Sequence, residues 1–339
     1  MRSFASDNNS GVHPLIFKAI EEANVDHAVG YGDDKWTEAA TAKIKEVFGE
    51  CADPYFLFNG TGANSVALQS ITRPFNSILC AASAHIYVDE CGAPQKMSGC
   101  SIVAIPTPNG KLTVDLIKPH LKNFGECHHS QPGAVYISQT TELGTVYTIE
   151  EIRAIADLIH SYGMYLHMDG ARLANAAAFL GCTLRQTTVD AGVDILSFGG
   201  TKNGMMMGEA VISFREEISR DLKYYRKQSA QLASKMRYLS AQFVPYLQDD
   251  LWLKSALAAN GAAAQLYEAL QRYSSVEFTQ EPQTNQLFLK MPKEAAEKLL
   301  EDYFFYFWDE QSGEVRFVTS WDTTAKDIED LIESFERVL

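Results

Sequence analysis

The chain has 339 residues, 46% of them hydrophobic and 21% charged, which is enough to bury a large core. Its 43 acidic residues outnumber 29 basic ones, the formal net charge is -14, and no block rich in Lys and Arg occurs. These features argue against DNA, RNA or an anionic membrane as a partner, because such partners select positively charged surfaces.

Six cysteines are scattered without a C-x-x-C pair, which suits reduced thiols and argues against a zinc or other metal site. No run of eighteen apolar residues occurs, and the N-terminal segment has neither the apolar stretch nor the cleavage site of a signal peptide. We therefore expect a cytoplasmic protein that does not enter a membrane.

Seven short apolar runs predict strands, and most are too unbroken to have one exposed face. They cover residues 55–58, 77–82, 101–106, 133–138, 164–168, 194–198 and 209–214. The stretches between them have helical periodicity, and one begins with a capping box of Thr148 and Glu151 and ends at Gly163. Buried strands that alternate with helices predict an α/β fold with a doubly wound, mostly parallel seven-stranded sheet.

The pattern changes towards the C-terminus, where helical stretches cover residues 215–247 and 255–274. Short strands near 284–291 and 313–321 and a closing helix at 325–339 predict a smaller α+β domain. We expect an N-terminal arm of residues 1–14, a large domain of residues 15–250 and a small domain of residues 251–339.

Two charged residues stand where predicted strands end. Asp169 follows the run at 164–168, and Lys202 comes shortly after the run at 194–198. In an open parallel sheet, ligands bind outside the carboxyl ends of the strands. Either residue alone is most simply a solvated loop charge, so a functional interpretation needs a ligand-binding segment at the same edge.

Residues 58–71 provide that segment, because a strand, a glycine-rich turn and an amphipathic helix direct backbone N–H groups at one point, as a phosphate site requires. A phosphate site, a strand-end acid and a strand-end lysine are together what pyridoxal 5'-phosphate needs. Lys202 would form an imine with its aldehyde, and Asp169 would keep its ring nitrogen protonated. Thr201 could add a hydroxyl to the phosphate, and His85 could stack on the ring.

Eight motifs resemble those of the bacterial low-specificity L-threonine aldolases, which have the aspartate-aminotransferase-like fold. They are FASDNNSGVHP, GYGDD, NGTGAN, AHIYVDECGAPQ, SQTTELGTVYT, MDGARLANA, SFGGTKNG and VRFVTSWDT, in this order from residue 4 to about residue 322. The set of site motifs is more specific than the fold alone, which hosts many reactions.

The resemblance implies a role for each matching position. Pyridoxal 5'-phosphate would be bound through Lys202, the ring nitrogen by Asp169, and the phosphate by Gly60, Thr61 and Gly62. The substrate carboxylate would be held by Arg172 and Arg316, assisted by Ser6, since a guanidinium grips a carboxylate with two hydrogen bonds. Each of the three has a simpler alternative. Arg172 could cap a loop, Arg316 could pair with an acid, and Ser6 could be a turn residue.

Three further positions also match motifs of the family. His128, next to His129, aligns with a second active-site histidine. Tyr31 resembles a residue near a subunit boundary, although a core tyrosine is an equal alternative. Arg237 could reach the phosphate of a partner chain, or it could be a solvated helix charge. The resemblance also implies a homodimer or a dimer of dimers with shared sites.

The implied reaction is retro-aldol cleavage of an L-3-hydroxy-2-amino acid, with threonine giving glycine and acetaldehyde. His85 and His128 are both candidates for the base, directly or through water. The alternatives are the same chemistry on phenylserine-like substrates, a transaminase or β-eliminating lyase, and an interaction protein that keeps the fold without the cofactor. The sequence does not choose between threonine and allo-threonine.

Overall fold

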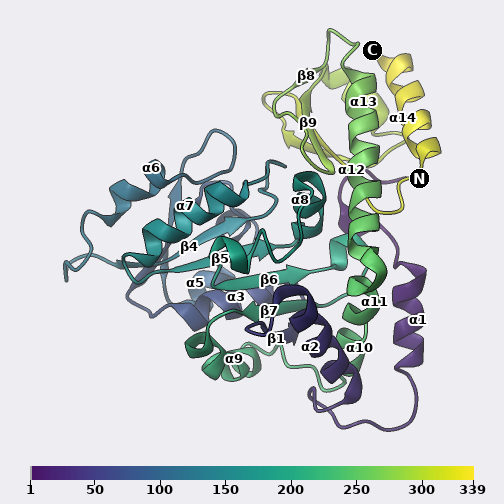
Figure 1. Ribbon diagram of the computed structural model, residues 1–339. Coiled ribbons are helices and arrows are strands. Elements are labelled where there is room, and N and C mark those ends of the chain that lie inside the picture. The colour runs from purple at the N-terminus through teal and green to yellow at the C-terminus, as the bar shows by residue number, and fades with distance from the viewer. Residues whose placement is uncertain (1) are drawn as a thin grey trace.

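The computed structural model describes residues 2–339, and a seven-stranded sheet lies at its centre (Figure 1). The strand order is β1-β7-β6-β5-β4-β2-β3. The strands are β1 (Asp53–Leu57), β2 (Asn76–Ala81), β3 (Ser101–Ile105), β4 (Gln131–Ser138), β5 (Tyr165–Gly170), β6 (Ile195–Gly199) and β7 (Glu209–Ser213). Strands β2 to β6 are parallel to one another, whereas β7 is antiparallel to both β1 and β6. All seven predicted strands and the mostly parallel sheet are confirmed.

Helices cover both faces of this sheet. The helices before the small domain are α1 (Pro14–Glu22), α2 (Lys35–Phe48), α3 (Gly60–Ile71), α4 (His85–Val88), α5 (Ala93–Ser98), α6 (Val114–Ile117), α7 (Ile149–His160), α8 (Leu173–Leu180), α9 (Glu216–Gln228), α10 (Arg237–Ser240) and α11 (Phe243–Leu247). Apolar residues of α2, α7 and α11 form one core cluster with the sheet, and those of α3 and α9 form another. Adjacent residues of one strand divide between the clusters, as Ile195 and Leu196 of β6 do. The sheet is therefore doubly wound, and strand alternation sends side chains into both cores.

Short 3-10 helices make up further parts of the chain: η1 (Asp7–Asn9), η2 (Lys118–Leu121), η3 (Val189–Ala191), η4 (Thr201–Asn203) and η5 (Gln248–Asp250). Helix α7 begins at the expected capping box, in which Thr148 and Glu151 bind each other's backbone N–H groups. Gly163 follows with a φ of 70°, a value that glycine adopts without strain.

The stretch at 215–247 is not the long helical region that its periodicity predicts. Helix α9 ends at Gln228, Ala230 adopts a positive φ of 58°, and helical structure resumes only at α10. The intervening Gln231 accepts a hydrogen bond from Phe58 N at 3.0 Å and fills the space beside Gly62, where a Cβ would collide with it. A tertiary contact to the turn before α3 thus overrides local helix propensity.

The small domain contains a four-stranded antiparallel sheet and its own core. Its elements are β8 (Glu277–Phe278), β9 (Gln286–Lys290), β10 (Tyr306–Asp309), β11 (Glu314–Val318), α12 (Leu251–Leu270), α13 (Lys293–Leu299) and α14 (Ala325–Val338). Helix α12 runs from the large sheet layer to this domain (Figure 1), with Trp252 in the large core and Leu266 in the small one. Phe4 of the arm also belongs to the small core, and its N–H and C=O bind Phe304 O and Val318 N, each at 2.7 Å. These contacts fix the arm to the small domain. Within residues 2–339, no helix combines the length and hydrophobicity needed to cross a bilayer.

Candidate active site

A cavity of about 270 Å³ opens at the carboxyl ends of β5 and β6. Its lining comes from five regions of the chain and includes Gly60, Thr61, Asn64, His85, Glu90, Asp169, Thr201, Lys202 and Glu209. The parallel register explains why they meet, since Asp169 in β5 pairs with Ser138 at the end of β4 and with Ser197 in β6. The predicted strand-end acid, strand-end lysine and glycine-rich turn therefore lie in one cavity, together with His85.

Asp169 is nearly buried, and its surroundings stabilise the ionised carboxylate. Its Oδ2 accepts hydrogen bonds from Asn64 Nδ2 at 2.9 Å and from Tyr136 Oη at 2.7 Å, and its Oδ1 accepts one from Ala171 N at 2.9 Å. Burial opposes ionisation, but the hydrogen bond from Asn64 and the charge of Lys202 hold the pKa of Asp169 below its usual value. A carboxylate in this state can hold a proton on a basic ring nitrogen.

Lys202 lies just beyond β6, in η4, and reaches the cavity. Burial lowers the pKa of its amine, the charge of Arg172 lowers it further, and the acids Asp7, Asp169 and Glu209 oppose the shift. A larger neutral fraction makes the amine a better nucleophile toward a carbonyl group.

The amino end of α3 forms another part of the cavity wall. Asn59 caps this helix by accepting from the N–H groups of Gly62 and Ala63, so the two preceding N–H groups remain available to an anion. A Cβ at Gly60 would meet no protein atom within 4 Å, so packing does not explain the glycine there, and the open side faces the cavity.

His85 begins α4 and is held by two acids. Its Nδ1 lies 2.8 Å from Glu90 Oε1, and its backbone N–H donates to Glu142 Oε1 at 2.8 Å. Glu90 Oε1 also accepts from Asn64 Nδ2 at 2.8 Å, which connects the histidine to Asp169 through one amide. The hydrogen bond to Glu90 raises the pKa of His85, against the effect of burial. Glu90 thus favours a proton on Nδ1 and leaves Nε2 as the available acceptor.

Glu209 is a second buried acid in the cavity wall. Thr201 Oγ1 lies 3.1 Å from its Oε1, and a Cβ at Gly199 would collide with its Oε2. Burial raises the pKa of Glu209 to about 8, although the Thr201 hydrogen bond and Lys202 lower it. Burial therefore disfavours the charged form of this side chain.

Two arginines lie beside the cavity, at the junction with the arm and the small domain. Arg172 follows Ala171, which lines the cavity, and binds Asp7 of the arm. Arg316 in β11 donates from Nη2 to Ala5 O at 3.1 Å, and burial lowers its pKa to about 10. The N-terminal arm thus brings together the two arginines that the sequence analysis assigns to the substrate carboxylate. Ser6 accepts from Asn8 N and caps η1, so its observed contact is structural.

Comparison with known proteins identifies the family. Residues 3–294 match the family described as beta-eliminating lyase. A Pseudomonas protein named low specificity L-threonine aldolase is 41% identical over all of this chain and 98% of its own length. The chain belongs to the low-specificity L-threonine aldolase family. A threonine aldolase structure from Leishmania major, 31% identical, superposes with a TM-score of 0.94 over 99% of both chains. A Listeria monocytogenes structure described as a putative L-allo-threonine aldolase, at 23% identity and TM-score 0.74 over 97% of this chain and 95% of its own, shows the shared fold.

Aldolases of this family depend on pyridoxal 5'-phosphate, and the residues present fit it. The available N–H groups at α3 suit a phosphate, the ionised Asp169 suits a protonated ring nitrogen, and Lys202 suits an aldehyde. In addition, Asn64 Oδ1 and Glu90 Oε2 are buried without a hydrogen-bond partner among residues 2–339, so the wall is built for a polar ligand.

Besides Ser6, Gly62, Arg172 and Arg316, three predicted site residues do not line the cavity, and His128 is the first of them. It lies in the exposed loop before β4, which Gln131 ties down by binding Gly125 N, Glu126 O and His129 O. This loop enters β4 at its amino end, and Asp169 pairs with the other end of the strand, about 20 Å away at 3.3 Å per residue. The interpretation of His128 as a base is therefore not supported within this chain, and its position before the strand predicted at 133–138 already indicated the amino end.

Tyr31 and Arg237 also do not line the cavity of their own chain. Tyr31 is 53% exposed, with the Lys227 ammonium over its ring. Arg237 starts the short α10 and donates to Val25 O at 2.9 Å and to Asp26 O at 3.3 Å. Any role for these two residues in catalysis requires a second chain.

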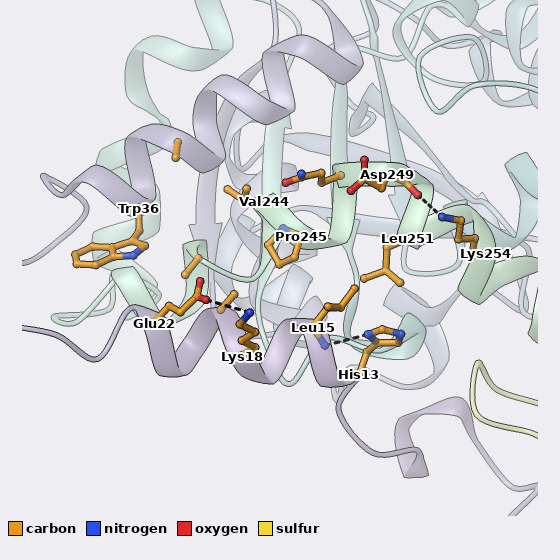
Figure 2. A pocket seen from close by; sticks show the side chains of 14 residues that line it. His13, Leu15, Lys18, Glu22, Trp36, Val244, Pro245, Asp249, Leu251 and Lys254 are labelled. Carbon is orange, nitrogen blue, oxygen red and sulfur yellow. Dashed lines mark hydrogen bonds and ion pairs between the residues drawn. The ribbon is translucent and has the colours of Figure 1, made fainter.

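A larger cavity of about 610 Å³ lies elsewhere, between α1, α2 and the segment from α11 to α12. Figure 2 shows Leu15, Val244, Pro245 and Leu251 around it, with Lys18 paired to Glu22 and Lys254 bonded to Asp249 at its rim. Asp169 and Lys202 do not line it, so size alone would have selected the wrong site.

The sequence analysis assigned no role to several residues that shape the site. Glu90 lies in a matching motif, and Asn64 lies in the NGTGAN motif, so both had a signal in the sequence. Asp7 lies in the FASDNNSGVHP motif, whereas Tyr136 and Glu209 had no signal beyond their position in a strand.

Proposed function

We propose that this chain cleaves L-threonine and related L-3-hydroxy-2-amino acids to glycine and an aldehyde, with pyridoxal 5'-phosphate as cofactor. The observation that carries the proposal is the meeting of Lys202, Asp169 and the amino end of α3 in one cavity. It is supported by the full-length similarity to a Pseudomonas protein named for this activity.

When bound, pyridoxal 5'-phosphate accepts the electron pair of a bond broken at the substrate α-carbon. The residues of the protein bind and orient the cofactor and the substrate. Lys202 would hold the aldehyde carbon of the cofactor, Asp169 would keep a proton on its ring nitrogen, and the α3 amides would bind its phosphate. Arg172 and Arg316 bind the substrate carboxylate.

His85 is the residue best placed to take the proton of the 3-hydroxyl group, directly or through water. Its Nε2 is the nitrogen that Glu90 leaves without a proton, and the side chain lines the cavity. Loss of that hydroxyl proton drives cleavage of the Cα–Cβ bond, which releases the aldehyde.

Replacing Glu90 with glutamine should move the acid limb of the pH profile of kcat/KM to lower pH. The base form of His85 is lost below its pKa, and the hydrogen bond and charge of Glu90 raise that pKa. Glutamine keeps an acceptor for Nδ1–H but removes the charge, so His85 stays neutral to lower pH and is a weaker base at the plateau. Steady-state kinetics from about pH 5.5 to about pH 9 measure this shift across the usual histidine range, with the exposed Glu150→Gln as control. An unchanged acid limb in Glu90→Gln would rule out His85 as the titrating base.

Product analysis separates the proposed reaction from other reactions of the same fold. Incubation of the holoenzyme with L-threonine should give glycine and acetaldehyde in equal amounts. Ammonia with 2-oxobutanoate would instead indicate β-elimination, the chemistry in the name of the matched family. Parallel reactions with allo-threonine and phenylserine define the aldehyde range.

We also propose that the active unit is a homodimer or a dimer of dimers whose sites are completed by a partner chain. Large apolar side chains are exposed near the cavity and in the loop before α2, namely Phe58, Met207, Val29 and Tyr31. Large apolar side chains of this kind would be covered by a subunit interface. A second chain would also give Arg237 a phosphate to bind.

Mixing two inactive variants tests shared sites. Lys202→Ala and Arg237→Ala should each be inactive, and unfolding and refolding them together should recover about a quarter of wild-type activity, because half of the random dimers are mixed and one of their two sites is intact. Arg237→Ala mixed with the double variant is the control and should recover none. A monomeric mass in light scattering together with full activity would contradict the proposal.

We infer a cytoplasmic location from the cysteines. None of the six is paired, and Cys51, Cys91 and Cys127 are exposed, a state that a reducing compartment preserves.

A further inference from the structure

Asp7 is a buried acid that accepts hydrogen bonds from Arg172. It is the first residue of η1, which packs against η4, the element that carries Lys202. Its side chain is fully buried and does not line the cavity. A fully buried carboxylate needs compensation by charge and hydrogen bonds, and both come from residues of the site.

The two hydrogen bonds between Arg172 and Asp7 use one edge of the guanidinium group. Nε donates to Oδ2 at 2.7 Å, and Nη2 donates to Oδ1 at 2.9 Å. Neither bond uses Nη1, and no residue of the described chain accepts a hydrogen bond from it. Since a guanidinium has a second edge formed by Nη1 and Nη2, Arg172 can bind another carboxylate end-on while Asp7 keeps the first edge.

Asp7 also compensates the positive charges that converge here. The charge of Arg172 helps to lower the pKa of both Lys202 and Arg316, and Asp7 acts in the opposite direction on each. Burial opposes ionisation of Asp7 itself, but Arg172 holds the pKa of this carboxyl below its usual value. The ion pair therefore allows two arginines and a lysine to lie close together.

The same carboxylate joins the parts of the protein. Asn285 of the small domain donates from Nδ2 to Asp7 Oδ2 at 3.0 Å, while Arg172 belongs to the large domain. The arm residue Ala5 accepts from Arg316. Asp7 is thus the point at which the arm fixes one substrate arginine relative to the other.

We propose that Asp7 is a positioning residue for the substrate carboxylate: it holds the Nε edge of Arg172, so that the Nη1–Nη2 edge faces the substrate. The proposal rests on the proposed function, because it assigns the bound group as the carboxylate of an amino acid.

Binding measurements on Asp7→Asn test it. Asparagine keeps the size of the side chain but offers only one acceptor oxygen and no charge. The Kd for glycine and the KM for L-threonine should rise by about 10- to 100-fold, the range for a lost charged hydrogen bond, while kcat changes less than about 3-fold. The amine 1-amino-2-propanol, which lacks the carboxylate, should bind both proteins within about 3-fold, as read from the cofactor spectrum.

Two further variants keep the result interpretable. The exposed Asp157→Asn should match wild type throughout. If Asp7→Asn does not fold, Asp7→Glu serves instead, since it keeps the charge but shifts its position. It should weaken binding of glycine more than binding of 1-amino-2-propanol, by a smaller factor than Asp7→Asn. Equal weakening of glycine and 1-amino-2-propanol, or no weakening of glycine, would overturn the proposal. A wild-type protein that binds glycine but leaves threonine intact would instead refute the proposed function. The ratio of the Kd for glycine to the Kd for 1-amino-2-propanol would still test the role of Asp7.

Discussion

Replacement of Lys202 by alanine is expected to lower kcat for threonine cleavage by on the order of 10⁴-fold or more, the size of effect seen when a covalent catalytic group is removed. The amine is the group that holds the cofactor in the cavity, and no other lysine of the described chain lines it. The fold should persist, because burial disfavours the charged form of this side chain and the alanine substitution removes that cost.

The measurement is steady-state acetaldehyde release together with thermal unfolding of the same preparations. Lys326→Ala is the matched control, since Lys326 is exposed on α14 and makes only a surface ion pair with Asp330. A Lys202→Ala protein that folds normally and cleaves threonine at a comparable rate would contradict the assignment.

Replacement of Asp169 by asparagine is expected to lower kcat by roughly 10²–10³-fold, the range for losing one preorganised electrostatic group. Asp169 accepts three hydrogen bonds through two oxygens, whereas asparagine has one oxygen and would point its NH₂ group at a donor. It would also lose the charge that keeps a proton on the ring nitrogen. Cofactor binding should weaken as well, which titration of the apoprotein would measure.

Two comparisons define this second result. Asp115→Asn, at an exposed carboxylate, should behave as wild type. Tyr136→Phe removes only one of the three hydrogen bonds to Asp169 and should lower kcat by only a few-fold. If Asp169→Asn kept wild-type kcat, the ring nitrogen would have to be managed by another residue.

Much of the fold and the centre of the site could be predicted because their signals are local. A buried strand is recognisable as an apolar run, and the acid or lysine at its end is close to it in the sequence, as Asp169 and Lys202 are. Parallel strands then bring their carboxyl ends to one edge without further information. The glycine-rich turn before α3 is likewise a continuous segment.

The partners of these residues depend on strand order and on long-range packing, which local patterns do not contain. Tyr136 binds Asp169 because β4 lies beside β5, and Asp7 meets Arg172 because the arm passes between the domains. The same reason explains one further difference, because the helix pattern of 215–247 yields to the contact between Gln231 and Phe58. His128 differs for a local reason, since it matched a motif but lies before β4, at the amino end of the strand.

The most direct test of the account is to locate the cofactor on the chain. Holoenzyme is reduced with borohydride, which makes the lysine–cofactor linkage permanent, then digested and mapped by mass spectrometry. The account predicts that the pyridoxyl phosphate mass lies on Lys202 and that prior incubation with glycine protects this residue from labelling. Labelling of a different lysine, or of none in a protein that cleaves threonine, would contradict it.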